Sequence, residues 1–175
     1  MLPKNYCTRC GERLTTRFTE GRERPFCEAC GVPVYENPVP ATAIVVVDEE
    51  ERILLVRRAE DPKKGEWCLP GGFMELSESP EECALRELLE ETALTGGIGD
   101  FLGATISPSD RYGNVLLLGY LVRSFQGEPA AGTDASDIAF FAREEMPRLA
   151  FDSHERFTRI YFACFSCSCE GEGQG

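Results

Sequence analysis

The stretch Gly71–Leu94, which reads GGFMELSESPEECALRELLEETAL, decides the fold of this chain. It starts as a glycine-rich loop and continues as a helix. Ser79, Pro80 and Glu82 are typical of a helix N-terminus: a capping serine, a proline at the first helical position and a glutamate that completes a capping box. The sequence therefore predicts a helix from Ser79 to about Thr92.

The predicted helix has two different faces. Glu87, Glu90 and Glu91 share one face, because side chains three and four residues apart are neighbours on a helix. Such like charges repel each other by roughly 0.2–0.5 kcal/mol per pair. They form either a solvated acidic face or a site for a divalent cation with oxygen ligands, such as Mg²⁺ or Mn²⁺. The opposite face is expected to pack into a core and carries Leu85, Leu88, Leu89 and Thr92.

The spacing over the whole stretch resembles the Nudix box, the signature of the Nudix hydrolase family. The residues that carry the resemblance are Gly72, Glu78, Arg86-Glu87-Leu88, Glu90-Glu91 and Ala93-Leu94. Ala93 departs from the family pattern, which has a glycine for a left-handed backbone at the helix C-terminus. Gly96 and Gly97 could end the helix slightly later.

The resemblance implies a catalytic metal site on this helix. Hydrolysis of a diphosphate needs water delivered to phosphorus and charge neutralised on the leaving phosphate, and metal ions can do both. By resemblance, the ligands of a catalytic Mg²⁺ or Mn²⁺ ion are Glu87, Glu90 and Glu91, with the backbone carbonyl of Gly71 or Gly72.

Other residues would support this chemistry. The resemblance implies that Glu78 and Arg86 orient the metal ligands and connect the loop to the helix. The general base of the family often comes from a loop outside the box. The candidates are Asp134 and Asp137 in GTDASDIAFF, which otherwise read as solvated loop acids, and then Glu75 and Glu87.

The cysteines indicate a second metal site. There are nine, an odd number, so complete pairing into disulfides is impossible. Cys7-Thr8-Arg9-Cys10-Gly11 and Cys27-Glu28-Ala29-Cys30-Gly31 are two copies of one knuckle, and paired CxxC motifs favour Zn²⁺ over disulfides or free thiols. Four thiolates complete a tetrahedral shell, so this zinc would be structural.

Three segments follow from these motifs. Residues 1–38 form a zinc ribbon and an extended linker, residues 39–163 a Nudix domain, and residues 164–175 a disordered tail with Cys164, Cys167 and Cys169. The first segment has six basic and five acidic residues. This near-neutral balance favours a docking or dimerisation module over a nucleic-acid binder.

The remaining pattern predicts an α/β protein. A buried strand at 41–47, a turn at 48–51 and a returning strand at 52–57 would form a hairpin, and further strands follow at 98–106, 114–123 and 138–142. A last helix covers Ser153–Cys164. The expected fold is a Nudix-type α/β/α sandwich with a mixed sheet, preceded by a small four-cysteine zinc ribbon.

Three further residue types need a role. Trp67 is interpreted as a core anchor, although a base could stack on it. His154, the single histidine, is interpreted as a surface or capping residue. Arg57 and Arg58 are either surface charges or contacts to a phosphate.

Charge restricts the partners. The chain has 18 basic and 30 acidic residues, a net charge of −12, which argues against coating nucleic acid. We find no pattern typical of a signal peptide or a membrane span, which predicts a cytoplasmic protein that acts on a small nucleotide and binds no membrane.

The order of ribbon, YENP linker, box and EEMPRLAFDSH resembles zinc-ribbon Nudix hydrolases that act as FAD or ADP-ribose pyrophosphatases. A homodimer is implied by the same resemblance. NADH pyrophosphatases share the layout but carry a Ser-Gln-Pro-Trp-Pro-Phe-Pro motif after the box, where this chain has ISPSDRYGN. An NADH- or NAD-type dinucleotide pyrophosphatase therefore stays an alternative, as does a non-catalytic Nudix-fold nucleotide sensor.

Overall fold

The computed structural model describes residues 4–166, which fall into two compact units. The smaller unit covers the chain up to Pro38 together with Pro108–Asn114. The larger unit covers Val39–Ser107 and the chain from Val115 onward. The helix that carries Glu87, Glu90 and Glu91 belongs to the larger unit, and the four cysteines of the CxxC motifs belong to the smaller one.

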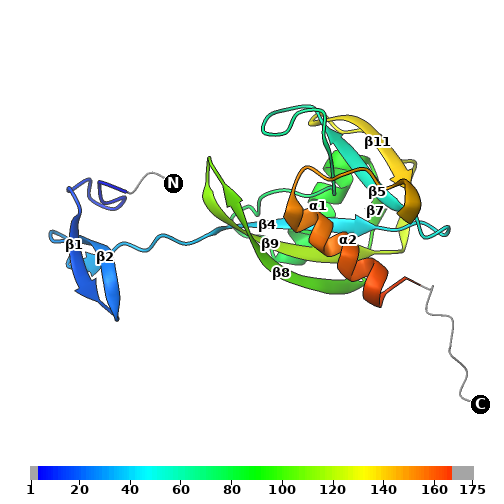
Figure 1. Cartoon of the computed structure of the whole chain (residues 1–175). Helices are drawn as coiled ribbons and strands as arrows, with labels where there is room; N and C mark the ends of the chain where they lie inside the picture. Colours follow the sequence, from blue (N-terminus) through cyan, green and yellow to red (C-terminus); the bar gives the residue numbers. More distant parts are fainter. Residues whose placement is uncertain (1–3, 167–175) are drawn as a thin grey trace, which may run out of the picture. The chain divides into compact units, whose positions relative to one another are not determined.

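The smaller unit is built on a three-stranded antiparallel sheet. Its strands are β1 (Thr15–Thr19), β2 (Arg22–Cys27) and β3 (Val32–Pro33), drawn in blue in Figure 1. Glu20 and Gly21 join β1 to β2 with positive φ angles of 52° and 81°, as tight hairpin turns require. The extended linker was expected to begin at Val32, but Val32 and Pro33 form β3.

Two three-stranded sheets organise the larger unit. One has the order β4-β9-β8, with β4 and β9 parallel, and the other has the order β11-β5-β6. A two-stranded pair, β7 (Thr95–Gly96) with β10 (Phe125–Gln126), completes the unit. The strands of the two larger sheets are β4 (Val39–Val46), β5 (Ile53–Arg58), β6 (Trp67–Cys68), β8 (Asp100–Ser109), β9 (Gly113–Val122) and β11 (Ala135–Phe141).

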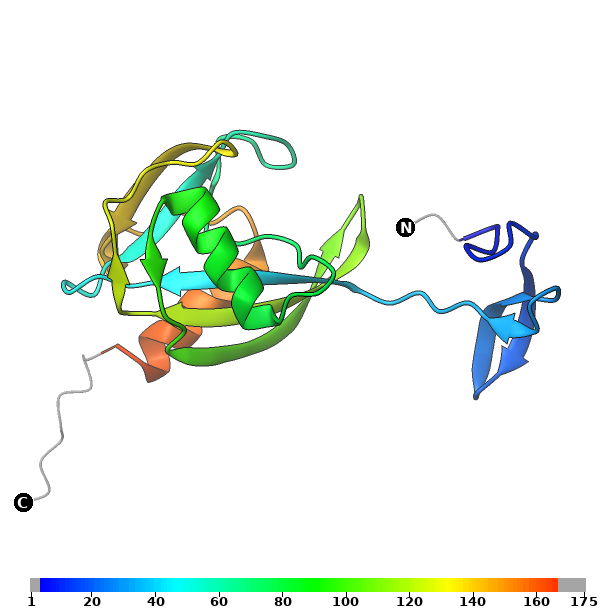
Figure 2. The same cartoon turned by 180° about the vertical axis from the view of Figure 1, so that it is seen from behind.

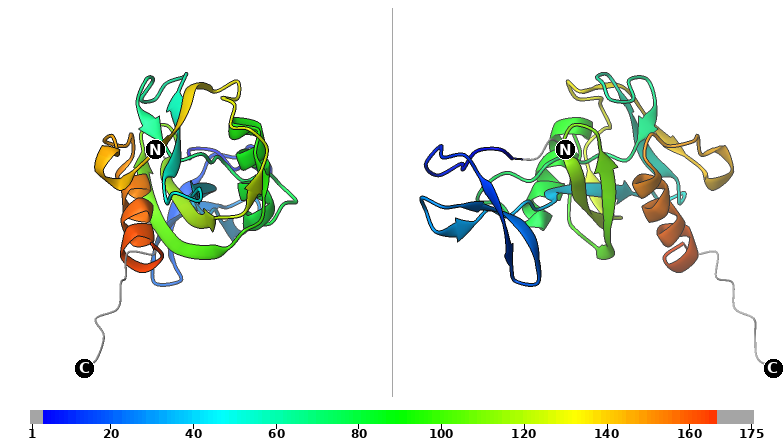
Figure 3. Two further views of the ribbon diagram at one scale, coloured as in Figure 1. Left: turned by 90° about the vertical axis from the view of Figure 1, so that its right-hand side faces the viewer. Right: turned by 60° about the vertical axis from the view of Figure 1, so that its left-hand side comes forward.

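Helices α1 (Pro80–Thr92) and α2 (Asp152–Cys164) cover opposite sides of the sheet that contains β4. Figure 1 shows α2 in front of this sheet, Figure 2 shows α1 from the other side, and the left view of Figure 3 shows the strands between them. The short 3₁₀ helix η1 (Arg143–Glu145) lies between β11 and α2 in the chain. The predicted α/β/α sandwich is confirmed, and its core forms because β-branched residues of β4 and apolar residues of α1 face each other.

The predicted hairpin between residues 41–47 and 52–57 is wrong. Its turn exists, since Glu51 N–H donates to the Asp48 carbonyl at 3.1 Å, but a single bridge, Val47 to Ile53, joins the strands. The glycine-rich loop takes the place of the hairpin partner. Thr42 N–H donates to the Gly72 carbonyl and Ile44 N–H to the Pro70 carbonyl, both at 2.9 Å.

The predicted apolar face of α1 needs one correction. Leu88 and Thr92 are fully buried, as expected, but Leu89 is 50% exposed. Cys83 and Ala84 are buried instead, because the face that meets β4 is rotated toward the glutamates. Glu87 and Glu91 are consequently only partly exposed.

The helix also ends where the box predicts. Ala93 itself adopts the left-handed conformation, with φ 59° and ψ 13°, and its N–H donates to the Leu89 carbonyl at 2.9 Å. The expected later end at Gly96 or Gly97 is wrong, because those residues lie in or beside β7.

At the other end of the chain, Cys164 closes α2 and is exposed. The rest of the predicted disordered tail from residue 167 onward, which includes Cys167 and Cys169, lies outside the described residues. Among residues 4–166, no helix is both long and apolar enough to cross a membrane.

Candidate active site and candidate metal centre

The N-terminus of α1 is fixed by its predicted cap. Ser79 accepts a hydrogen bond from Glu82 N–H at 3.2 Å, and the Glu82 carboxylate accepts one from Ser79 N–H at 2.7 Å. The Tyr120 hydroxyl donates to Glu81 at 2.9 Å and ties the first turn to β9. These contacts fix the helix axis on the sheet, and with it the positions of the three glutamates.

The glycine-rich loop lies directly on β4. Gly71 has a φ of 146°, and a Cβ there would lie 2.2 Å from the Thr42 carbonyl oxygen. A Cβ on Gly72 would lie 2.3 Å from an oxygen of Glu87. Glycine is required at position 71, where backbone atoms approach too closely for a side chain, whereas a side chain at position 72 would displace the Glu87 carboxylate.

The loop also holds the last glutamate of the box. Gly71 N–H donates to Glu91 Oε2 at 2.9 Å. Burial raises the pKa of Glu91 to about 7; the Gly71 amide opposes the rise, while the charges of Glu87 and Asp134 add to it. A carboxylate that is difficult to ionise alone is stabilised in its charged form by a nearby cation.

Arg86 connects the loop to the other glutamates. Its Nε and Nη2 donate to the two oxygens of Glu78 at 3.0 and 2.9 Å, and its Nη1 donates to Glu87 at 2.7 Å and to Glu90 at 3.1 Å. The hydrogen bonds from Arg86 lower the pKa of Glu78 to about 2. The Glu75 N–H also donates to Glu78, at 2.7 Å, so the loop before α1 is tied to the helix through one carboxylate.

The three glutamates do not converge on one point as they stand. Metal ions in proteins bind groups of acidic, histidine or cysteine side chains. Within residues 4–166, the four cysteines are the only such group of three or more that lies close enough to share one ion. Arg86 draws Glu87 and Glu90 together, while Gly71 holds Glu91 apart from them. The donor set is all oxygen, which fits a hard divalent cation; rotation of the half-exposed Glu90 side chain would be needed to complete it.

The two candidates for the general base that lie outside the box differ in their surroundings. Asp134 precedes β11, its carbonyl accepts Ala59 N–H at 2.9 Å, and its charge raises the pKa of Glu91. Asp137 lies on β11 at a bulge, and its carboxylate accepts the N–H of Ile138 at 2.9 Å. Asp134 is therefore the acid that is electrically coupled to the carboxylate face.

The loop that carries Asp134 is fastened to α1, a contact that the sequence analysis missed. Ala130 N–H donates to the Thr92 carbonyl at 2.9 Å, and Gly132 N–H donates to the Glu91 carbonyl at 3.0 Å. A Cβ on Gly132 would lie 2.2 Å from the Glu90 carbonyl oxygen. The glycine in GTDASD was the available signal, since a loop glycine marks a close backbone approach.

The prediction that His154 is a surface or capping residue is wrong, since the N-cap of α2 is Phe151 and has no side-chain cap hydrogen bond. The side chain is 8% exposed, and its Nδ1 accepts the N–H of Leu69 at 3.1 Å. Trp67 is half-buried with its ring 5.0 Å from that of Phe141 in an edge-on contact, which agrees with a core anchor.

The guanidinium groups of Arg57 and Arg58 form hydrogen bonds with the neighbouring loop. Arg57 Nε donates to the Gly65 carbonyl at 2.8 Å, and Arg58 Nε donates to the Pro62 carbonyl at 2.6 Å. The charge of Arg58 also lowers the pKa of Glu91.

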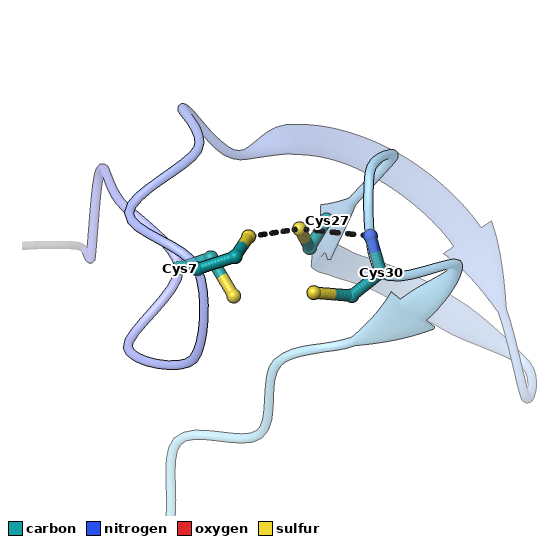
Figure 4. Close-up of side chains that lie close together, drawn as sticks. Cys7, Cys27 and Cys30 are labelled. Atoms are coloured by element: carbon teal, nitrogen blue, oxygen red, sulfur yellow. Dashed lines mark hydrogen bonds between the residues drawn. The ribbon is translucent and has the colours of Figure 1, made fainter.

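The four predicted zinc ligands meet in the smaller unit. One sulfur from each of Cys7, Cys10, Cys27 and Cys30 lies within 4.8 Å of all the others. Figure 4 shows the side chains of Cys7, Cys27 and Cys30 pointing toward one another from two separate loops. The spacing and the all-sulfur donor set fit a tetrahedral metal ion.

Backbone amides support these sulfurs. Arg9 N–H donates to Cys7 Sγ and Cys30 N–H to Cys27 Sγ, each at 3.4 Å. The amide of Arg9 lowers the pKa of Cys7 to about 7, whereas hydrogen bonding to Cys10 and Cys27 raises the pKa of Cys30 to about 12. All four thiols can ionise together only when a cation offsets their repulsion.

Comparison with known proteins identifies the family. The NUDIX domain model matches residues 37–161, which is most of the chain. This chain is a member of the Nudix hydrolase family. The match includes the whole of α1 and the loop before it.

Individual relatives are consistent with this assignment. The chain is 39% identical over 124 residues to the ADP-ribose pyrophosphatase of Methanocaldococcus jannaschii, covering 70% of this chain and 73% of that protein. It is 27% identical over 145 residues to the NAD-capped RNA hydrolase NudC of Pseudomonas aeruginosa, covering 82% of this chain and half of that protein. The crystal structure of a NUDIX hydrolase from Nitrosomonas europaea superposes with a TM-score of 0.76 at 25% identity, covering 91% of each chain.

Proposed function

We propose that this chain is a Mg²⁺-dependent ADP-ribose pyrophosphatase, with Mn²⁺ as a substitute ion. The oxygen of a water molecule forms a bond to one phosphorus and its proton passes to the general base, while the bridging P–O bond breaks with its electron pair on the leaving phosphate, so that AMP and ribose 5-phosphate result. The observation that carries this proposal is the Arg86 network, which arranges Glu78, Glu87 and Glu90 beside the glycine loop that holds Glu91. The 39% identity to an ADP-ribose pyrophosphatase supports the choice of substrate.

Each side chain has a proposed task. Glu87, Glu90 and Glu91 would hold the divalent cation, which supplies water activation and charge neutralisation when bound. Gly72 already uses its carbonyl to accept Thr42 N–H, which favours the carbonyl of Gly71 as the additional ligand.

Arg86 and Glu78 would orient these ligands. Arg86 binds Glu87 and Glu90 through one nitrogen, so it keeps their carboxylates close together despite their repulsion. Asp134 is the proposed general base, because its charge acts on the carboxylate face and its loop is fastened to α1. Asp137 is the second candidate, and its distinct contact to Ile138 makes the two separable by mutation.

The four cysteines would bind a structural Zn²⁺ ion. Their four sulfurs would complete a tetrahedral shell and leave no open position for a substrate. A unit of this size buries too little apolar surface to be stable without such an ion.

A second candidate is a pyrophosphatase for NADH- or NAD-type dinucleotides, favoured by the similarity to a protein named as an NAD-capped RNA hydrolase. FAD, whose diphosphate has the same chemistry, is a further substrate to compare. The chain could act as a homodimer in the cytoplasm, as the resemblance of its layout implies. These substrates share an AMP half and therefore one product.

One assay separates the alternatives. The protein is incubated with ADP-ribose, FAD or NADH in the presence of Mg²⁺, and AMP is measured over time. We expect the fastest release from ADP-ribose and no turnover by the Glu90→Gln variant, whose circular dichroism should match the wild type. Absence of AMP from all three substrates would favour the non-catalytic nucleotide sensor, and retention of more than about a tenth of the rate by Glu90→Gln would move the metal site elsewhere.

A further inference from the structure

His154 is a buried polar residue that the proposed chemistry does not use. It lies in the first turn of α2, on the side of the sheet opposite to α1. Its ring is 5.1 Å from the ring of Phe151, and its side chain is 8% exposed. Burying an imidazole costs free energy unless its nitrogens form hydrogen bonds. The hydrogen-bond partner of His154 therefore indicates its role.

The partner of His154 is a backbone amide at the start of the glycine loop. Leu69 N–H donates to His154 Nδ1 at 3.1 Å, over 85 residues of sequence separation. Because Nδ1 accepts this bond, the ring is neutral and carries its proton on Nε2. Burial and the charge of Arg58 lower the pKa of His154 to about 3, so the acceptor persists at neutral pH.

This contact takes the place of the next hydrogen bond in a short parallel β-ladder between Trp67 and Leu149. Trp67 and Leu149 form a parallel bridge, and Ala150 N–H donates to the Trp67 carbonyl at 2.8 Å. A continued parallel ladder would supply a backbone carbonyl for Leu69 N–H, but the chain turns into α2 after Phe151. The imidazole of His154 replaces that carbonyl.

The segment from Leu69 to Gly72 is consequently held from three directions. His154 of α2 binds Leu69 N–H, Ile44 of β4 binds the Pro70 carbonyl, and Glu91 of α1 binds Gly71 N–H. The Leu69 side chain is 1% exposed and packs in the core. The His154 contact therefore lies two residues before the amide that orients Glu91.

We propose that His154 is a positioning residue that fixes Leu69 and Pro70, and through Gly71 N–H sets the orientation of the Glu91 carboxylate. The inference rests on the proposed function, since it treats Glu91 as a metal ligand. Residues that orient a metal ligand typically change metal affinity or activity about 10- to 100-fold when they are removed. His154 acts through Leu69 and touches neither substrate nor metal.

Three variants of the full-length chain test this role. His154→Leu keeps an apolar side chain in the site but removes the acceptor. His154→Asn restores an acceptor, because Oδ1 of asparagine stands two bonds from Cβ, as Nδ1 of histidine does. Phe157→Leu is the matched control, since Phe157 is a fully buried residue of the same helix that packs against Gly119 instead of the loop.

Two readouts follow the loop itself. Amide hydrogen exchange by NMR reports the protection of Leu69 and Gly71, and Mn²⁺ titration followed by electron paramagnetic resonance reports metal affinity. We expect His154→Leu to lose protection at both amides and to bind Mn²⁺ about tenfold more weakly. His154→Asn should lie within about threefold of the wild type, and Phe157→Leu should bind Mn²⁺ normally even where its melting temperature falls.

Steady-state kinetics with ADP-ribose add a third readout. We expect His154→Leu to lower kcat about tenfold and to raise the Mg²⁺ concentration for half-maximal rate, with a smaller change in KM. Protected Gly71 in a folded His154→Leu protein, or an equal defect in His154→Asn and His154→Leu, would overturn the proposal. If the wild type hydrolyses none of the substrates, the proposed function fails, and the exchange of Gly71 alone decides the role of His154.

Discussion

Arg86 donates hydrogen bonds to both carboxylate oxygens of Glu78, from Nε to Oε2 at 3.0 Å and from Nη2 to Oε1 at 2.9 Å. This forked contact joins the loop before α1 to the helix, and the remaining nitrogen of the same side chain serves Glu87 and Glu90. One guanidinium group thus organises three carboxylates. The arrangement depends on the planar, multiple-donor geometry of arginine.

Arg86→Lys should therefore reduce activity although it keeps the charge. A lysine has a single nitrogen and cannot bind Glu78 twice while also binding Glu87 and Glu90. We expect kcat to fall about tenfold or more, measured by AMP release. Arg17→Lys is a control, because its pair with Glu28 is about half exposed, and such pairs contribute about 1 kcal/mol at most. Equal activity of Arg86→Lys and wild type would show that position 86 supplies only charge.

Gly72→Ala should separate catalysis from folding. The φ of Gly72 is not in the left-handed region, but the added Cβ would meet Glu87 Oε1 at 2.3 Å, so that carboxylate must move. We expect a folded protein whose kcat/KM is reduced about 10- to 100-fold. In Gly97→Ala the Cβ meets nothing within 4 Å, so this control should retain its rate. Full activity of Gly72→Ala would remove Glu87 from the proposed metal site.

Removing the metal from the four-cysteine site should unfold the smaller unit. We expect one zinc ion per chain by elemental mass spectrometry, and its loss in Cys27→Ser but not in Cys164→Ser, since Cys164 is an exposed residue at the end of α2. Structural zinc contributes on the order of 10 kcal/mol to such modules. The NMR signals of β1 and β2 should therefore lose dispersion after chelation. A dispersed spectrum of a metal-free protein would contradict a structural role.

Acid should destabilise the protein through His154. Its folded-state pKa is about 3, while an unfolded histidine has a pKa of about 6.5. Between these values only the unfolded chain binds the proton, so the stability contribution is complete above about pH 6.5 and is lost as the pH falls toward 3. Lowering the pH from about 7 to about 5 should cost about 2 kcal/mol at this residue.

Urea unfolding at the two pH values measures this effect. Trp67 is the single tryptophan and reports the larger unit by fluorescence. The stability difference between wild type and His154→Asn should shift by about 2 kcal/mol in favour of the variant at the lower pH. A constant difference would mean that the folded protein accommodates the charged imidazole.

Local signals in the sequence predicted local structure well. The start of α1 at Pro80 follows from Ser79 and Glu82, because capping involves residues three apart in the chain. The cysteine knuckles likewise predicted a cluster of four sulfurs. The five predicted strands match β4, β5, β8, β9 and β11 to within about three residues, whereas β1, β2 and the four two-residue strands were not predicted.

Contacts between distant segments could not be predicted in this way. The environment of His154 depends on Leu69, and the rotation of α1 that exposes Leu89 depends on its packing against β4. The departure at Ala93 was assigned to a shifted helix end, but the structure keeps the end and gives alanine a left-handed φ of 59°.

The attachment of Ala130 and Gly132 to the last turn of α1 has a consequence for engineering. Peptide tags or new loop sequences inserted between Gly127 and Gly132 would detach the backbone that satisfies the Thr92 and Glu91 carbonyls. Libraries that aim to change substrate choice should therefore keep the length of this connection constant and vary only side chains that have room.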